Sequence, residues 1–313
     1  MKKPKPARKQ KAPKKKKSKA TGVRRVNDES RAKSIHIDFT RIDEIFARID
    51  FEAFPFAPDS EEMKAYLEAE YMNHIISSHI RSKDQIRDIA FMALESSPAC
   101  AGAYVTLGQL SQSVEDKIGL FKRGELVAEH LLGKDFFEKN SGSFDQFHEA
   151  RSYLKALLEL AKVYSFLGDF ENAILYLKKL FEVEEEAVFT LHQVLLALLT
   201  ESGRYEEAEE VLERFSSETT VAVLYTRALL QFRKWGDSED ANNSVIMAID
   251  RYRNVARALT SNPSPTKEDI RDLVQHETNL DVLSENWYVL ICCNAWQQTE
   301  GAISWLAERL EKV

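Results

Sequence analysis

The sequence predicts an all-α fold, because prolines are absent from a long stretch, apolar residues follow a helical period, and glycines recur at turns. No proline occurs in the 164 residues from 99 to 262, and interior prolines break helices. Apolar residues there recur three and four apart, as in Leu157, Leu160, Ala161 and Tyr164, which is the helical period. Alternating β-branched runs and Asn-Gly or Asp-Gly pairs are missing, so no sheet is expected.

Composition narrows the class of protein further. The chain has 313 residues, of which 44% are hydrophobic and 30% charged, so it can bury a substantial core. Its longest apolar runs, such as 194–199 and 287–293, are far shorter than the roughly 18 residues of a membrane-spanning helix. Its three cysteines form no CxxC pair, which favours a reducing compartment. We therefore expect a cytoplasmic protein that is not an integral membrane protein.

Charge is divided unevenly along the chain. Residues 1–26 hold 13 of the 43 Lys and Arg residues and no acid, which leaves 30 bases against 50 acids elsewhere. This segment is rich in Lys and Pro and has no apolar cluster, so it is predicted to be a disordered basic tail. The residues expected to supply electrostatic binding are Lys14, Lys15, Lys16, Lys17, Arg24 and Arg25.

Four segments follow from these patterns. They are a disordered basic tail at 1–34, a helical docking and capping segment at 35–97, a repeat region at 98–262, and C-terminal capping helices at 263–313. In the second segment Thr40 is expected to cap a short helix, and two longer amphipathic helices are expected at about 60–80 and 83–96.

The repeat is marked by its turns. Gly168, Gly203 and Gly236 are spaced 35 and 33 residues apart, and each is expected to lie in a turn between two helices. Five residues after each glycine stands an alanine, and four residues later an apolar residue; the two sets are Ala173, Ala208 and Ala241, and Leu177, Leu212 and Val245. Small residues at these positions let paired helices approach closely.

At these residues the chain resembles the tetratricopeptide repeat family, whose unit is a helix-turn-helix of about 34 residues. The resemblance implies a helical solenoid. An earlier unit begins near Ala101, where Tyr104, Leu107 and Gly108 fit the first-helix pattern. An insertion of about 133–153 separates it from the three clearer repeats.

A narrower resemblance, over about 85–310, is to bacterial tetratricopeptide proteins related to the suppressor of tumorigenicity seven family. It rests on the stretches 97–104, 132–156 and 299–306. The resemblance implies helical repeats and partner binding, and it implies no reaction.

In such an array the first helices line a concave groove. Spacing places eight candidate partner-binding residues there: Lys155, Lys162, Phe166, Gln193, Glu201, Thr226, Arg233 and Lys234. An acidic or amphipathic peptide suits this mixture, with Phe166 as an apolar anchor and the cations pairing carboxylates. The competing interpretation is an ordinary solvated helix face.

Two aromatic groups are interpreted as packing rather than as ligand sites. Phe136, Phe137, Phe144, Phe147 and Tyr153 are expected to hold the insertion against the stack. Three tryptophans nine residues apart are expected to form the apolar face of the capping helices: Trp287, Trp296 and Trp305.

Enzyme signatures are missing from the sequence. HExxH, GxSxG, GxxxxGK[ST] and GxGxxG do not occur, and these are the commonest zinc-protease, hydrolase and nucleotide motifs. We therefore expect no enzymatic activity, no cofactor and no metal.

The function predicted from the sequence is a protein-interaction scaffold or adaptor that binds a peptide or protein in the groove. The alternative is a nucleic-acid-associated protein, in which the tail binds phosphates without sequence choice and the repeats recruit partners. The oligomeric state and the partner's identity stay open.

Overall fold

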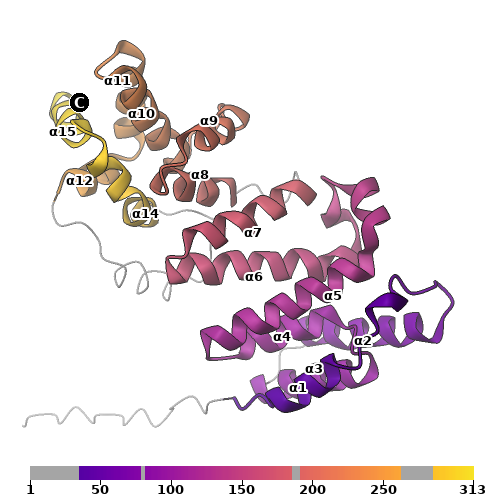
Figure 1. Ribbon diagram of the computed structural model, residues 1–313. Coiled ribbons are helices and arrows are strands. Elements are labelled where there is room, and N and C mark those ends of the chain that lie inside the picture. Colours follow the sequence, from indigo (N-terminus) through magenta and orange to yellow (C-terminus); the bar gives the residue numbers. More distant parts are fainter. Residues whose placement is uncertain (1–34, 79–81, 185–190, 262–284) are drawn as a thin grey trace, which may run out of the picture. The chain divides into compact units, whose positions relative to one another are not determined.

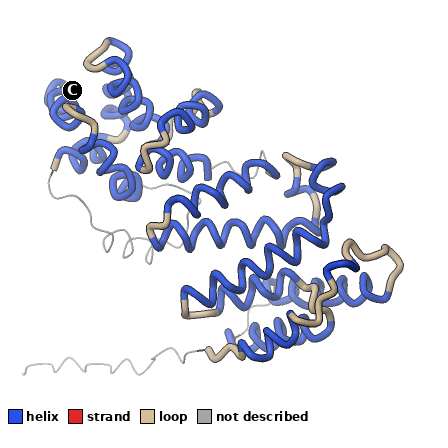
Figure 2. Tube along the Cα trace, viewed as in Figure 1, coloured by secondary structure: helices blue, strands red, loops and turns tan. Residues whose placement is uncertain are grey.

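The structure is a computed structural model, and it describes residues 35–78, 82–184, 191–261 and 285–313 (Figure 1). The predicted basic tail at 1–34 and the first part of the predicted capping segment, 263–284, lie outside the described residues. No β-strand occurs in the described ranges (Figure 2), and one isolated bridge pairs Ser143 with Glu184. The predicted all-α class is confirmed.

The N-terminal half of the described chain contains seven α-helices: α1 (Phe39–Phe46), α2 (Glu61–Ser78), α3 (Lys83–Ser96), α4 (Ala101–Leu110), α5 (Val114–Asn140), α6 (Arg151–Leu167) and α7 (Phe170–Val183). Short 3-10 helices η2 (Phe144–Gln146) and η3 (His148–Ala150) join α5 to α6. The two helices predicted at about 60–80 and 83–96 are confirmed as α2 and α3. The cap predicted at Thr40 is wrong. The helix α1 begins at Phe39, and its N-cap is Asp38, whose side chain accepts a hydrogen bond from the backbone N–H of Arg41.

The C-terminal half contains α8 (Leu191–Glu201), α9 (Tyr205–Arg214), α10 (Val221–Trp235), α11 (Glu239–Arg251), α12 (Arg253–Thr260), α14 (Glu285–Gln298) and α15 (Ala302–Lys312). Consecutive helices pack as hairpins, namely α4 with α5, α6 with α7, α8 with α9 and α10 with α11. First helices of successive hairpins also touch, as α2 with α4, α4 with α6, and α8 with α10. This is the nearest-neighbour packing of a helical repeat solenoid.

The repeat glycines occupy corresponding bends with positive φ, although ψ is −147° at Gly236 and 18° at Gly168. Gly168, Gly203 and Gly236 have φ of 69°, 72° and 63°, in the left-handed region that glycine adopts without steric cost. Each lies between the two helices of its hairpin, at the end of α6, α8 and α10. The alanines five residues later are fully buried, so the close approach of paired helices predicted from their small size is confirmed.

The insertion begins where α5 bends. Gly133 has φ 68° and ψ 160° inside α5, and beyond it the chain turns through η2 and η3 into α6. Phe144 and Tyr153 are buried there. Their rings, with those of Phe136 and Phe137, meet at centroid distances of 5.0 to 6.2 Å, in two edge-to-face and two tilted pairs. The predicted packing role is confirmed for Phe144 and Tyr153, whereas Phe136 also lines a pocket described below.

The C-terminal tryptophans also pack as predicted. Trp287, Trp296 and Trp305 expose 4% of their surface or less. Trp305 donates to the Asn242 side chain of α11 at 2.9 Å, which ties α15 to the last hairpin.

Candidate partner-binding site

One face of α6 carries the first three candidate residues. Lys155, Lys162 and Phe166 lie seven and four residues apart, so they share a side of the helix. Lys155 is exposed, and Lys162 and Phe166 are partly exposed. Partial desolvation of the ammonium group lowers the pKa of Lys155, and the negative charge of Glu159 opposes this shift. This face therefore offers two ammonium groups and a phenyl ring to solvent.

A carboxylate between the two lysines sets the geometry of that face. Glu159 lies 4.0 Å from the Lys162 ammonium, atom to atom. It also accepts a hydrogen bond of 3.0 Å from the Gln109 amide of α4. The polar line across α4 and α6 is thus ordered by contacts between two neighbouring first helices.

The equivalent face of α8 and α10 is not open. Helix α14 packs against α8, α10 and α12. Gln193 on α8 is 6% exposed, and Thr226 on α10 is fully buried. The open groove expected at these positions is therefore filled by the chain itself.

Specific contacts fix α14 in this place. The Glu201 carboxylate accepts hydrogen bonds from the Asn294 side chain at 2.8 Å and the Ala295 backbone at 3.0 Å. The Thr226 hydroxyl lies 3.3 Å from the hydroxyl of Tyr288. Desolvation by burial raises the pKa of Glu201, and its two hydrogen bonds to α14 oppose that shift.

The last two candidates on α10 also have intramolecular partners. The Arg233 guanidinium carbon lies 3.7 Å from the ring centroid of Tyr205, a cation–π contact, and Arg233 donates to the Thr299 hydroxyl at 3.2 Å. Lys234 pairs with Glu209 of α9 at 3.4 Å. Of the eight candidates, Lys155, Lys162 and Phe166 are those brought together on a face that α14 leaves open.

The spacing of residues did not predict that α14 covers α8, although the composition of α8 indicates that it is buried. Nearly every residue from Leu191 to Leu199 is apolar, and all of them are buried. A helix that is hydrophobic on all sides is surrounded by protein, so α8 has no solvated groove face. That composition indicates a covering element without saying which segment supplies it.

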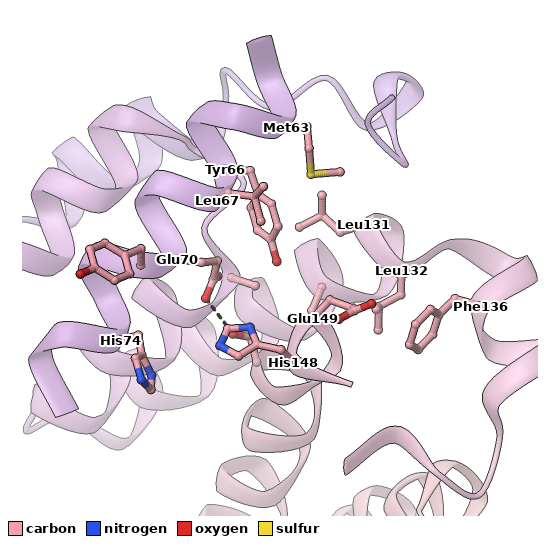
Figure 3. Close-up of a pocket in the computed structure, with 14 residues that line it drawn as sticks. Met63, Tyr66, Leu67, Glu70, His74, Leu131, Leu132, Phe136, His148 and Glu149 are labelled. Atoms are coloured by element: carbon pink, nitrogen blue, oxygen red, sulfur yellow. Dashed lines mark hydrogen bonds between the residues drawn. The ribbon is translucent and has the colours of Figure 1, made fainter. Parts of the chain in front are cut away.

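A pocket of about 490 Å³ was also missed (Figure 3). It lies between α2, the C-terminal part of α5 and the segment that enters α6. Figure 3 shows Leu67, Glu70 and His74 of α2 facing His148 and Glu149 across it. The available signal was the spacing of Met63, Leu67 and Tyr71, one apolar line along α2.

Potential metal ligands and cysteine thiols are the reactive side chains that the described residues place. Among the described residues no three His, Cys, Asp or Glu side chains gather as metal ligands. Desolvation raises the pKa of the buried Cys100 and Cys292 thiols, which disfavours the thiolate that acts as a nucleophile. The six tail residues proposed for electrostatic binding, Lys14, Lys15, Lys16, Lys17, Arg24 and Arg25, lie outside the described part of the chain.

Comparison with known proteins identifies the repeat. A tetratricopeptide repeat family model matches residues 154–186, which are α6, α7 and the turn at Gly168. No curated protein and no solved structure matches the chain. Across the described ranges, no helix is both long and apolar enough to cross a membrane. The matched hairpin is thus similar to a tetratricopeptide repeat, and the following two hairpins share its positive-φ glycine at the bend.

Proposed function

We propose that the chain is a non-enzymatic scaffold or adaptor that binds a partner peptide or protein on the open face of α6. The observation that carries this proposal is the accessibility of Lys155, Lys162 and Phe166 on the first helix of the hairpin that matches the repeat family. Tetratricopeptide repeats are generally non-enzymatic interaction modules, which supports recognition over turnover.

The chemistry of that face favours an acidic or amphipathic peptide. Phe166 supplies an apolar contact, and the two lysines pair carboxylates. Gln193, Glu201, Thr226 and Arg233 take part in partner binding only if α14 leaves α8 and α10, so we assign them to intramolecular packing. We further propose a cytoplasmic location and a relationship to bacterial proteins of the suppressor of tumorigenicity seven type.

Charge reversal tests the proposal. Full-length protein and the Lys155→Glu/Lys162→Glu double variant are used for affinity capture from the native host, with partners identified by mass spectrometry. A partner of this face should bind the double variant about tenfold or more weakly, the loss of roughly one charge-assisted contact.

The matched control is Lys134→Glu/Lys139→Glu. It makes the same charge change on α5, where both lysines are at least 73% exposed and pair only within their own helix. An equal loss of partner affinity in both double variants would mean that net charge alone causes the effect, and this would contradict a site on α6. Denaturant midpoints of all three proteins establish that folding is unchanged.

The tail supports a second candidate function. Thirteen positive charges without an acid in residues 1–26 can neutralise phosphates, with affinity that falls steeply as salt rises. Deleting 1–26 separates the two proposals: loss of all partner capture supports the nucleic-acid function, whereas retention of protein partners supports the scaffold.

A further inference from the structure

The pocket beside α2 has apolar walls. Met63 and Leu67 of α2 form one side, and Leu131, Leu132 and Phe136 of α5 form the other (Figure 3). It lies at the bend where α5 departs from the hairpin at Gly133, so the insertion of this chain builds part of it. It is therefore separate from the face of α6 that carries Lys162 and Phe166.

The polar part of the pocket is acidic. The Glu70 carboxylate accepts hydrogen bonds from the backbone N–H of Gly102 at 3.1 Å and from the Ser152 hydroxyl at 3.4 Å, with the Cys100 thiol at 3.5 Å. Glu149 stands on the facing segment (Figure 3). Within the described residues neither carboxylate forms an ion pair with a Lys or Arg, and no Lys or Arg side chain lines the pocket.

Neighbouring charges leave this acidic character in place. His148 and Lys155 lie near enough to interact electrostatically with Glu70, but neither is within ion-pairing distance of it. Desolvation by burial raises the pKa of Glu70. A bound cation would favour the charged form of this carboxyl group and form an ion pair with it in a partly desolvated place, where Coulomb attraction is stronger than in water.

Two large apolar side chains beside the pocket are exposed. Leu67 and Tyr71 expose 57% and 66% of their surface, and they lie about one helical turn from each other on α2. Exposed apolar surface next to a concave, apolar pocket marks a binding site more often than a free surface. A ligand that fills only the pocket would leave this surface uncovered, so the occupant extends along α2.

We propose that this pocket binds a segment of a partner protein in which a Lys or Arg stands next to a bulky apolar residue. The basic head group reaches Glu70 and Glu149, its aliphatic stem contacts the leucines of the walls, and the apolar neighbour covers Leu67 and Tyr71. This inference rests on the scaffold function and names the chemistry of a partner at a second surface. Glu70 and Glu149 favour a cationic over an anionic ligand.

The experiment selects peptides on the full-length chain from a phage-displayed random library, then measures binding of each enriched synthetic peptide by fluorescence anisotropy. Two variants report the two halves of the site. Glu70→Gln removes the charge and keeps one acceptor oxygen for the backbone N–H of Gly102, and Leu67→Ser removes exposed apolar surface. Met92→Ser on α3 is the control, because Met92 is also 57% exposed but lies outside the pocket.

The expected result is a peptide class that carries Lys or Arg beside Leu, Phe, Tyr or Trp. Its affinity should fall by about tenfold in Glu70→Gln and in Leu67→Ser and be unchanged in Met92→Ser. Replacing the basic residue by citrulline or norleucine should remove the dependence on Glu70.

The proposal is overturned if no enriched peptide is weakened by both pocket variants, or if the weakened peptides lack a cation. Tighter peptide binding after deletion of residues 1–26 would also overturn it, since the chain's own basic tail would then be the occupant. If no enriched peptide depends on Glu70 while partner capture still depends on Lys155 and Lys162, this pocket is refuted and the scaffold function stands.

Discussion

The carboxylate of Glu201 on α8 accepts a hydrogen bond of 3.0 Å from the backbone N–H of Ala295 on α14. These two residues are 94 positions apart in the chain, and the contact holds α14 on the face of α8 that was expected to be open. Tyr288 and Trp296 of the same helix are fully buried, so α14 is part of the core. This packing restricts partner access to the N-terminal part of the array.

Removing the Glu201 carboxylate should loosen α14. We expect Glu201→Ala to lower the free energy of unfolding by about 1–2 kcal/mol, since two hydrogen bonds to α14 are lost. Lys234→Ala is the control, because it removes an exposed pair with Glu209 and a cation–π contact with the exposed Trp235. It should change stability by less than about 0.5 kcal/mol. Urea midpoints of both variants measure this, and equal midpoints for Glu201→Ala and wild type would contradict the fixing role.

Stability should also depend on pH through Glu201. Burial raises its pKa in the folded chain above the usual 4.5, so the folded state holds its proton more tightly than the unfolded state. The stabilisation is therefore complete below the unfolded value and is lost as pH rises through the folded value. Glu201→Gln lacks this titration.

The measurement is the difference in free energy of unfolding between wild type and Glu201→Gln over roughly pH 4 to 8. Wild type should lose stability relative to the variant as pH rises above 4.5, then run parallel to it. A difference that stays constant, or that moves in wild type's favour with rising pH, would contradict the effect of burial on this carboxyl.

The repeat alanines give a test of the helix pairing. Ala173 and Ala208 have no exposed surface, and each lies on the second helix of a hairpin. Leucine at either position should overpack the hairpin and cost about 1–3 kcal/mol. Ala258→Leu on α12, at an exposed position, should change stability by less than about 0.5 kcal/mol. Unchanged denaturant midpoints in both repeat variants would disprove close packing at the alanines.

The hairpins were predictable because their signals are local. Each repeat contains its own glycine at a bend, an alanine five residues later and apolar residues at the helical period. These residues contact one another within the same hairpin, so their effect can be deduced from a short stretch of sequence. The same holds for the tryptophans of α14 and α15, whose apolar character predicts burial. The cap at Thr40 failed by a small margin, because Asp38 is an equally good cap nearby.

The binding surface was less predictable because it depends on contacts between distant segments. Spacing predicts that Gln193 and Thr226 lie on an open groove face of first helices, whereas both are buried beneath α14. Periodicity does not show that a segment distant in the sequence covers that face. The pocket at Glu70 likewise requires α2, α5 and the insertion together. Such tertiary contacts have no counterpart in the local sequence.

Two glycines with opposite backbone requirements provide the last prediction. Gly168 has φ 69° at the bend after α6, whereas Gly119 is helical within α5, and no atom lies within 4 Å of a methyl group added at either site. Sterics with neighbours are thus equal, and only backbone conformation differs. Alanine disfavours positive φ but favours the helix, so Gly168→Ala should cost about 1 kcal/mol, and Gly119→Ala should gain about 0.5–1 kcal/mol.

Thermal or urea unfolding of the two variants measures both the expected loss of stability in Gly168→Ala and the expected gain in Gly119→Ala. Because neither substitution removes a side-chain contact, the difference between them isolates the left-handed bend on which the repeat geometry depends. If Gly168→Ala were as stable as Gly119→Ala, the bend after α6 would not require the left-handed backbone, and the equivalence of the three repeat turns would lose its physical basis.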